Sequence, residues 1–587
     1  MKKLKLNNCI IINKQMVIPF LICLFFFFCH LFFYKIKFET NDDLTMNLIS
    51  IGAYKGWKET HLVYINYIHG LLLAVLNKNF PNHNWYVYIH LIIAFISITS
   101  ICCTIGKRLS LSLSAFFSCL FNYIIATSLY SYLQFTKISA IATVAAALLF
   151  YDYIVNNTTI LRGGGIFLFI IGLCLRREAF FMILPFVSVL MIGSLWQIRG
   201  KIDKIKKLIF VVSICILSII SVNYINLKAY SDNDWIIYKE FNRTRAELLD
   251  IGIPSYKEYE KEYNQLNISE NDINTIANWI YNDKNFFSKE KLQQWRRVEP
   301  ISIFHLSFKK IYHTFKNLRY SFKRYILVKI STLCLLGGFF FLKKEKKILP
   351  IILLGLLLLE YYYFACLDRT RWYCEFGIWS TICFIVLCFV GEEFFLKDIN
   401  KIFIRNRIVL IKLFLGQYIV KKNKLKYFCI VLTCFLVVLK LGISLNKYYE
   451  YKDKIVDIPQ VLKFAQRTHG DKNTYILDVV TFVSEEANVF ELTSDKFYEI
   501  FDNHVPAGGW GIPAPCFANM PQIPDLIKRN HLYYVANSRS AKIVQKYLSE
   551  HYCSDIIVEQ AGRVANIPIW IYKKDIKKTA IINSATE

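Results

Sequence analysis

Long apolar segments alternate with polar ones along most of the chain. A helix needs about 20 apolar residues to cross the hydrocarbon core of a bilayer. Segments that meet or approach this length lie at 17–34, 86–105, 110–128, 138–154, 208–226, 325–342, 348–366, 376–396 and 427–445. Arg176, Arg177 and Glu178 divide a further apolar segment into a short span at 164–175 and a second span at 179–196. The pattern predicts a polytopic α-helical membrane protein with about eleven spans.

The last part of the chain, residues 447–587, has a different pattern. Short apolar runs typical of buried strands lie at 474–480, 531–536 and 567–572. The apolar spacing of amphipathic helices is found at 458–467 and 539–551. We therefore expect a transmembrane body over 1–446, followed by a small α/β domain over 447–587. The Pro- and Gly-rich run 506–515 predicts a loop, in which Trp510 either packs within a turn or faces a sugar ring.

The distribution of charge predicts the orientation. The formal net charge is +27, and lysines gather beside apolar segments at 2–5, 201–207, 343–347 and 421–426. Basic loops of membrane proteins remain in the cytoplasm. The N-terminus and the loops at 107–108, 155–163, 197–207, 343–347 and 397–426 are therefore predicted to be cytoplasmic, and the C-terminal domain extracytoplasmic. Because no nucleic-acid-binding module accompanies the lysines, we do not expect nucleic acid as a partner.

Two long segments then fall outside, at 35–85 and 227–322. Within the first, residues 61–76 are apolar but short and interrupted by polar residues, so we interpret them as a helix lying on the membrane surface. A spanning helix, which would invert the topology after it, is the alternative. The second segment is charged, with helical stretches at 257–265 and 286–297, and predicts a helical insertion on the outer face.

Most of the 17 cysteines lie in apolar segments, where cysteine behaves as a small hydrophobic residue. Their spacing does not predict a zinc site. Cys516 and Cys553 lie in the C-terminal domain, and the sequence leaves open whether they pair.

A cluster of acids follows the first span directly, in Glu39-Thr40-Asn41-Asp42-Asp43. Neighbouring carboxylates raise each other's pKa, which suits a general base. Asp42 and Asp43 could also ligate a divalent cation such as Mg²⁺ or Mn²⁺. The structural alternative is that Asn41 or Asp42 caps a helix over 43–52.

Arginines lie on the predicted outer side despite the charge rule, at Arg176, Arg177, Arg369 and Arg371. The planar guanidinium donates two hydrogen bonds to a phosphate and stays charged, so these are candidate phosphate ligands. They could equally pair with nearby acids at the membrane surface.

The layout resembles the GT-C superfamily of membrane glycosyltransferases. In these enzymes the first span is followed by a long outer loop with a catalytic acid near its start and helices along the membrane. Here the acids are Asp42 and Asp43, followed by Gly52-Ala53-Tyr54-Lys55-Gly56-Trp57. The family also has a second long outer loop after the seventh span, and many members have an outer C-terminal domain. The resemblance in layout covers the whole chain, but in sequence it is specific only over about 39–86.

The resemblance implies an inverting transfer of a sugar from a polyprenyl phosphate or diphosphate to a cell-surface glycan or lipid. Asp43, with Asp42 as the alternative, would act as the base, and the arginines would stabilise the departing phosphate. Glu178 would orient Arg176 or Arg177, Gln134 and Lys137 would line the substrate cavity, and Trp57 would stack on a sugar. The bias toward Lys, Asn, Ile and Phe suggests a bacterial protein of the cytoplasmic membrane. Three alternatives are a glycan polymerase or ligase, a transporter, and an assembly factor without enzymatic activity. The spans carry few ionisable residues at mid-depth, which disfavours the transporter.

Overall fold

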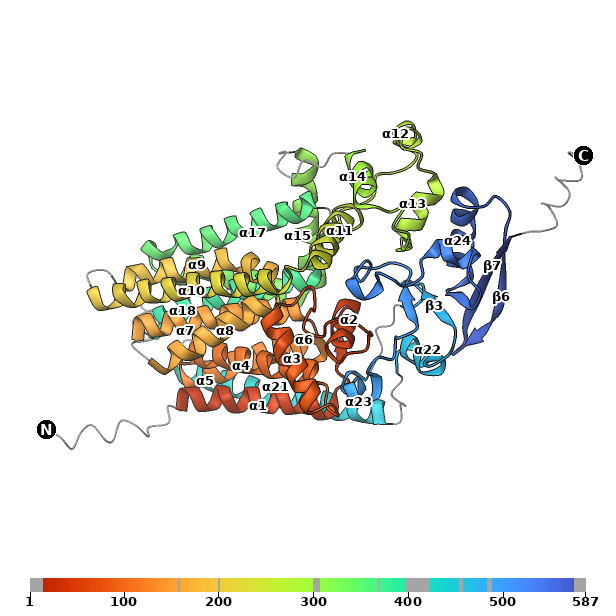
Figure 1. The fold of residues 1–587 in the computed structure, drawn as a ribbon. Helices are drawn as coiled ribbons and strands as arrows, with labels where there is room; N and C mark the ends of the chain where they lie inside the picture. Colours follow the sequence, from red (N-terminus) through yellow and green to blue (C-terminus); the bar gives the residue numbers. More distant parts are fainter. Residues whose placement is uncertain are drawn as a thin grey trace, which may run out of the picture.

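The computed structural model describes residues 14–156, 159–198, 201–298, 307–367, 369–395, 422–452, 458–482 and 488–574. The N-terminal lysines and residues 396–421, which include most of the predicted basic loop at 397–426, lie outside these ranges. Figure 1 shows a bundle of long helices at one end and a mixed helix and sheet region at the other.

Every apolar segment predicted from the sequence coincides with a helix. The helices of the bundle are α1 (Lys14–Phe33), α4 (Trp85–Gly106), α5 (Leu111–Phe121), α6 (Thr127–Ser131), α7 (Phe135–Asn156), α8 (Thr159–Leu175), α9 (Arg177–Ile198), α10 (Ile202–Ala229), α16 (Ile326–Phe341), α17 (Ile348–Cys366), α18 (Trp372–Phe395) and α21 (Lys422–Lys452). A π-helical turn, η1 (Asn122–Ala126), joins α5 to α6.

The bundle has the helices of a polytopic membrane protein. Among the described residues, nine helices are individually long and apolar enough to cross a membrane. The prediction at 325–342 corresponds to α16, which meets the preceding helix α15 (Phe308–Arg324) at a bend of 107°. The prediction at 164–175 corresponds to α8, whose apolar part is shorter, at Arg162–Leu175.

Helix α7 forms the centre of the bundle, since 94% of its apolar stretch is buried, compared with 11% for the peripheral α10. Its sequence is rich in Ala, Ser and Thr, and small side chains let neighbouring helices approach closely. A Cβ added to Gly377 of α18 would lie 2.7 Å from the Cβ of Ala140. One added to Gly172 of α8 would lie 2.6 Å from the hydroxyl oxygen of Thr143.

At one end of the bundle, which we call the basic end, buried ion pairs connect several helices. Asp152, near the end of α7, pairs with Arg108 and Lys107 after α4. Glu392 of α18 pairs with Arg108 and with Lys346, which lies in the 3₁₀ turn η2 (Lys344–Lys346) between α16 and α17. Two loops that the sequence predicts to be cytoplasmic, at 107–108 and 343–347, therefore lie at the same end of the bundle.

Short elements cover the opposite end. They include α2 (Asn41–Ser50), α3 (Tyr67–Asn79), and the parallel pair β1 (Lys37–Phe38) and β2 (Tyr132–Leu133). The helix predicted at 61–76 begins later, at Tyr67, because the Asn66 side chain accepts a hydrogen bond from the backbone N–H of Ile68 and caps it. With 13 residues, α3 is about 20 Å long, shorter than the hydrocarbon core of about 30 Å, in line with a surface helix.

The described residues of the segment 227–322 are largely helical, and we call this segment the cap. Its helices are α11 (Asn233–Leu249), α12 (Glu260–Gln265), α13 (Glu270–Ala277), α14 (Lys289–Arg297) and α15. The stretches predicted at 257–265 and 286–297 correspond to α12 and α14.

The C-terminal region, which we call the tail domain, contains a five-stranded sheet in the order β4-β3-β5-β7-β6. Its strands are β3 (Thr474–Leu477), β4 (His504–Pro506), β5 (Leu532–Val535), β6 (Ile556–Val564) and β7 (Ile567–Lys574). Strands β4, β3 and β5 are parallel, and β7 is antiparallel to both its neighbours. The helical elements are α22 (Gln460–Thr468), α23 (Ser494–Phe497), α24 (Ser538–His551), and the short 3₁₀ turns η4 (Val489–Glu491), η5 (Pro515–Phe517) and η6 (Ile523–Ile527). Cys516 and Cys553 are free thiols.

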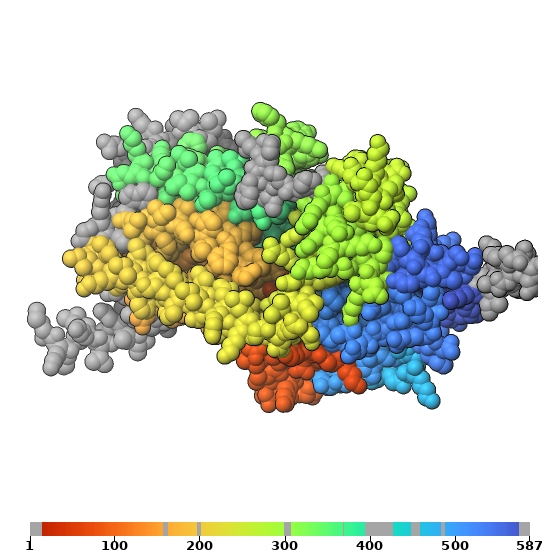
Figure 2. All heavy atoms as spheres, turned by 45° about the horizontal axis from the view of Figure 1, so that its top comes forward, coloured from red at the N-terminus to blue at the C-terminus, as the bar shows by residue number. Residues whose placement is uncertain are grey.

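The tail domain packs against both the cap and the segment that follows α2. The carbonyl of Ala507 accepts hydrogen bonds from the backbone N–H groups of Tyr281 and Asn282 in the cap. On the other side, the backbone N–H groups of Glu499 and Phe501 donate to the carbonyls of Gly52 and Ala53. Figure 2 shows the cap and the tail domain in continuous contact on this face.

Candidate functional site

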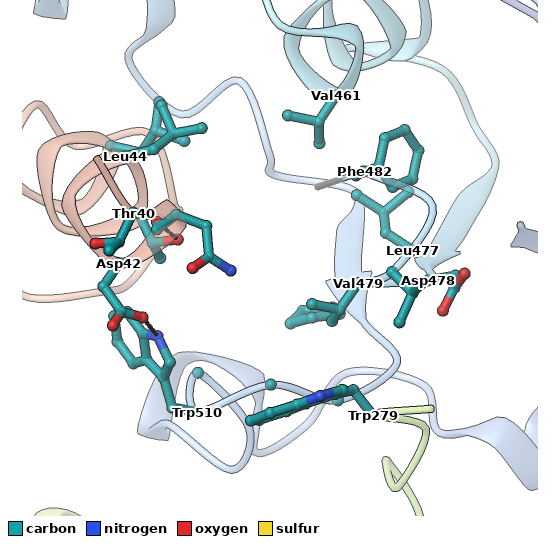
Figure 3. A pocket seen from close by; sticks show the side chains of 18 of the residues that line it. Thr40, Asp42, Leu44, Trp279, Val461, Leu477, Asp478, Val479, Phe482 and Trp510 are labelled. Carbon is teal, nitrogen blue, oxygen red and sulfur yellow. Dashed lines mark hydrogen bonds between the residues drawn. The ribbon is translucent and has the colours of Figure 1, made fainter. Parts of the chain in front are cut away.

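A cavity of about 450 Å³ lies where α2, the cap, the loop between α17 and α18 and the tail domain meet. Its polar and aromatic lining includes Thr40, Asp42, Thr45, Tyr54, Trp57, Tyr64, Arg245, Asp250, Trp279, Arg369, Arg371, Tyr373 and Trp510. Figure 3 shows Asp42 and Thr40 on one wall and side chains of the tail domain, among them Leu477 and Phe482, on the opposite wall.

The helix geometry of α2 separates the two aspartates. The helix begins at Asn41, with Thr40 in extended conformation before it, so neither Asn41 nor Asp42 is the capping residue. Consecutive residues of an α-helix point about 100° apart, so Asp42 and Asp43 point in different directions. Asp42 lines the cavity, whereas Asp43 is fully buried.

Asp43 connects elements of the protein interior. Its Oδ1 accepts hydrogen bonds from the Tyr86 hydroxyl at 3.0 Å and from the Phe135 backbone N–H at 3.3 Å. Its Oδ2 accepts a hydrogen bond from the Thr40 hydroxyl at 2.9 Å. Burial raises the pKa of Asp43 to about 8, although these hydrogen bonds act to lower it. Asp43 therefore connects α2 to α4 and α7, and its carboxyl group does not face the cavity.

Asp42 lies half-buried at the cavity wall. Its Oδ1 accepts a hydrogen bond at 2.9 Å from Nε1 of Trp510, a contact that also joins α2 to the tail domain (Figure 3). Burial raises the pKa of Asp42, while the Trp510 hydrogen bond and the charges of Arg176 and Arg369 act to lower it. A carboxylate with one oxygen held and a raised pKa has the properties of a general base.

Three arginines line the same cavity. Arg369 pairs with Asp250 at 3.1 Å, and the buried Arg245 lies 3.7 Å from the other oxygen of Asp250. Arg245 is also fixed by Asn242, whose Oδ1 accepts hydrogen bonds from its Nε and a terminal nitrogen. Arg371 is exposed and lies on the same loop as Arg369. Three guanidinium groups along one cavity, two of which share a single acidic partner, have the chemistry to bind an anion.

The other predicted arginines lie outside this lining. Arg176 pairs with Glu178 at 2.9 Å, and its guanidinium lies 4.7 Å from the ring centre of Tyr64, a cavity residue. Arg177 is exposed and lies 3.4 Å from Glu178. Arg176 therefore contacts the cavity through Tyr64, acts on Asp42 through its charge, and forms an ion pair with Glu178.

Lys137 and Gln134 are buried at the start of α7 and do not line the cavity. Lys137 pairs with Glu39 and donates hydrogen bonds to the carbonyl and hydroxyl of Ser128. The Gln134 side chain accepts hydrogen bonds from the backbone N–H groups of Thr136 and Lys137, which caps α7. Both residues position the helix behind Asp43.

Aromatic side chains form much of the remaining wall. Trp57 lines the cavity and packs edge-on against Trp510 and Phe517, with its Nε1 donating to the carbonyl of His61. Trp510 is both packed and part of the cavity wall. Trp279 of the cap has a backbone φ of 60°, uncommon for a large residue, and its ring lies to the right of Trp510 at the lower side of the view in Figure 3.

The loop that carries Trp510 depends on close packing at Gly508. A Cβ at this position would lie 1.8 Å from the carbonyl oxygen of Trp279, whereas one at Gly511 would lie 3.7 Å from the Trp57 ring. We expect Gly508→Ala to force the loop from the cap and lower the free energy of unfolding by about 1–3 kcal/mol. Gly511→Ala is the matched control. Thermal unfolding and limited proteolysis of the two variants measure the difference, and equal results would show that the contact at Gly508 is dispensable.

Asp42 and Asp43 do not together form the divalent cation site that the sequence suggested. Both oxygens of Asp43 are occupied by protein donors and its side chain points away from Asp42. Within the described parts of the chain, one His/Cys/Asp/Glu group is close enough to hold a metal ion, formed by Asp272, Glu550 and His551. It lies between α13 and α24, where His551 binds Asp272 at 2.7 Å and so connects the cap to the tail domain.

Arg245, Asp250 and Trp279 were not among the predicted site residues. All three lie in the charged insertion, where nothing local distinguishes Arg245 from the exposed Arg243 on the same helix. They reach the cavity only because the cap packs against the tail domain.

Comparison of the chain with models of protein families gives no match, and comparison with curated proteins gives none either.

Proposed function

We propose that the protein is a membrane glycosyltransferase that uses a sugar linked to a polyprenyl phosphate or diphosphate and an acceptor glycan or lipid. The observation that carries the proposal is the joint presence of Asp42, three arginines and several Trp and Tyr rings around one cavity at an end of a membrane bundle. A general base, phosphate ligands and rings that can stack on a sugar are the groups that such a transfer requires.

In the proposed reaction, Asp42 removes the proton from an acceptor hydroxyl as its oxygen attacks the anomeric carbon. The bond from this carbon to the phosphate oxygen breaks, and the phosphate leaves with the electron pair and its lipid. Arg369 and Arg371 stabilise the developing charge, with Arg245 behind them. A single displacement inverts the anomeric centre.

The cavity lies at the end of the bundle opposite the basic end. If the basic end is cytoplasmic, as the charge rule predicts, the reaction takes place on the outer face of a bacterial cytoplasmic membrane. The N-terminus would then be cytoplasmic and the tail domain extracytoplasmic.

Mass spectrometry of surface glycans and lipid-linked sugars in a deletion strain tests the proposal. We expect the deletion to remove one sugar from a glycan and to accumulate its lipid-linked donor, because transfer is blocked and synthesis continues. Rescue with Arg371→Gln should restore about 1% of the transfer or less, since loss of one donor to a developing anion costs about 10²–10³-fold.

Arg243→Gln, which changes an exposed arginine outside the cavity lining, is the matched control and should rescue fully. Unchanged glycans and lipid-linked sugars in the deletion strain would contradict the proposal. A change in glycan chain length with unaltered composition would instead identify a polymerase or ligase, which would use the same kind of site.

A further inference from the structure

Helix α15 has a composition unlike that of any neighbouring helix. Six of its 17 residues, Phe308–Arg324, are Lys or Arg, and its sequence contains no Asp or Glu. Aromatic residues alternate with these cations. A basic helix with an aromatic face is typical of a helix that lies on a membrane surface.

The position of α15 relative to the bundle also fits a membrane surface. It continues into the apolar helix α16 through a bend of 107° at Tyr325, and Figure 1 shows it crossing the end of α17. A helix that meets a membrane-spanning helix at nearly a right angle lies close to the plane of the bilayer. In that orientation its open side would face lipid headgroups.

The three faces of α15 have different chemistry. Phe308, Tyr312, Phe315 and Phe322 recur at helical spacing and are 92, 65, 58 and 46% exposed, respectively. The exposed Arg319 falls within this otherwise aromatic stripe. Exposed cations flank this stripe on one side, at Lys309, Lys316 and Lys323. The face toward the protein carries small polar residues, among them the buried Thr314 and Ser321.

The protein side of α15 holds the loop that carries Arg369 and Arg371. Asn317 donates a hydrogen bond to the Thr370 hydroxyl at 2.9 Å, and Ser321 donates to Glu375 at 2.5 Å. The ring of Tyr325 stacks on Trp372 with centres 3.5 Å apart. These contacts keep the aromatic stripe and the lysines turned away from the cavity.

We propose that α15 is an interfacial helix that binds anionic phospholipids of the bilayer, with its aromatic stripe at the acyl boundary and its lysines on the phosphates. Charge complementarity and the direct continuation into α16 identify the lipid surface as the partner. The inference does not depend on the reaction proposed for the cavity.

The test uses the full-length protein in neutral detergent micelles with dansyl-labelled phosphatidylglycerol, followed by energy transfer from the native tryptophans. Unlabelled phosphatidylglycerol should displace the probe at least about tenfold better than phosphatidylcholine. The variant Lys309→Gln/Lys316→Gln/Lys323→Gln should bind the probe at least about tenfold more weakly, because each lysine beside an anionic lipid surface contributes roughly a fivefold change.

The control variant Lys257→Gln/Lys261→Gln/Lys542→Gln removes the same charge from exposed lysines of the cap and tail domain and should bind like the wild type. Equal affinity of the two variants would overturn the proposal. Equal displacement by the two unlabelled lipids, which requires no variant, would also overturn it. Displacement by millimolar inorganic phosphate would indicate a site for free phosphate and contradict the assignment to lipid.

Discussion

Asparagine in place of Asp42 is expected to lower sugar transfer by about 10²–10⁴-fold, the range that a general base contributes. The amide keeps an oxygen to accept the hydrogen bond from Trp510, so the contact between α2 and the tail domain should persist. It cannot take the acceptor proton. The turnover of purified protein with the donor identified in the deletion strain measures the effect, and thermal unfolding checks that the fold is retained.

Asp43→Asn provides the contrasting variant. Because burial raises the pKa of Asp43 to about 8 from an ordinary value of 3.8, the folded protein keeps its carboxyl group protonated near neutral pH. The oxygen of the new amide would still accept from Tyr86 and Phe135, and its nitrogen could donate to Thr40. We therefore expect Asp43→Asn to retain most of the transfer. A loss of activity in Asp43→Asn, with Asp42→Asn active, would assign the base to Asp43 instead.

The raised pKa of Asp43 also predicts the direction in which the stability of the protein changes with pH. The unfolded carboxyl group ionises near pH 4 and the folded one near pH 8, so the folded state holds the proton more tightly between these values. The stability that depends on this proton is complete below about pH 4 and declines as the pH rises toward 8. Thermal unfolding of the wild type should show this decline relative to Asp43→Asn, since asparagine does not titrate.

Removal of the Asp152 carboxylate at the basic end is expected to lower the free energy of unfolding by about 3–5 kcal/mol, the cost of breaking a buried ion pair. Arg108 is only 6% exposed, and Asp152→Ala would remove its acidic partner on α7. The same substitution would remove the acidic partner of Lys107. The connection between α4 and α7 would be weakened, while the pair of Arg108 with Glu392 of α18 would remain. Thermal unfolding in detergent measures the change.

Glu247→Ala is the matched control, because Glu247 forms an exposed pair with Arg243 one helical turn away, which contributes about 0–1 kcal/mol. If the two variants unfold at the same temperature, the buried network does not stabilise the bundle.

The sequence alone located the helices of the bundle and the main elements of the tail domain. Apolar segments of about 20 residues can bury their backbone in a membrane only as helices. The strands β3, β5 and β7 were recognisable as well, because each is a short apolar run between polar turns. The bend between α15 and α16 was not predicted, since both sides of Tyr325 are compatible with a helix.

The candidate site was predicted in part. The sequence indicated Asp42, Arg369, Arg371 and Trp57, because charged and aromatic residues beside a predicted span stand out against apolar surroundings. Which aspartate faces the cavity depends on where α2 begins. The sequence predicted a start at residue 43, but α2 begins at Asn41, and Asp43 then points into the core.

Only the tertiary structure brought Arg245, Asp250, Trp279 and Trp510 to the cavity. These residues lie on the cap and the tail domain, far along the chain from Asp42, and local pattern carries no information about how such segments pack together. Conversely, Lys137 and Gln134 resemble site residues in sequence, yet packing buries them behind Asp43. The sequence thus determined the helices through the hydrophobic effect acting locally, whereas contacts between distant segments decided which polar groups share the cavity.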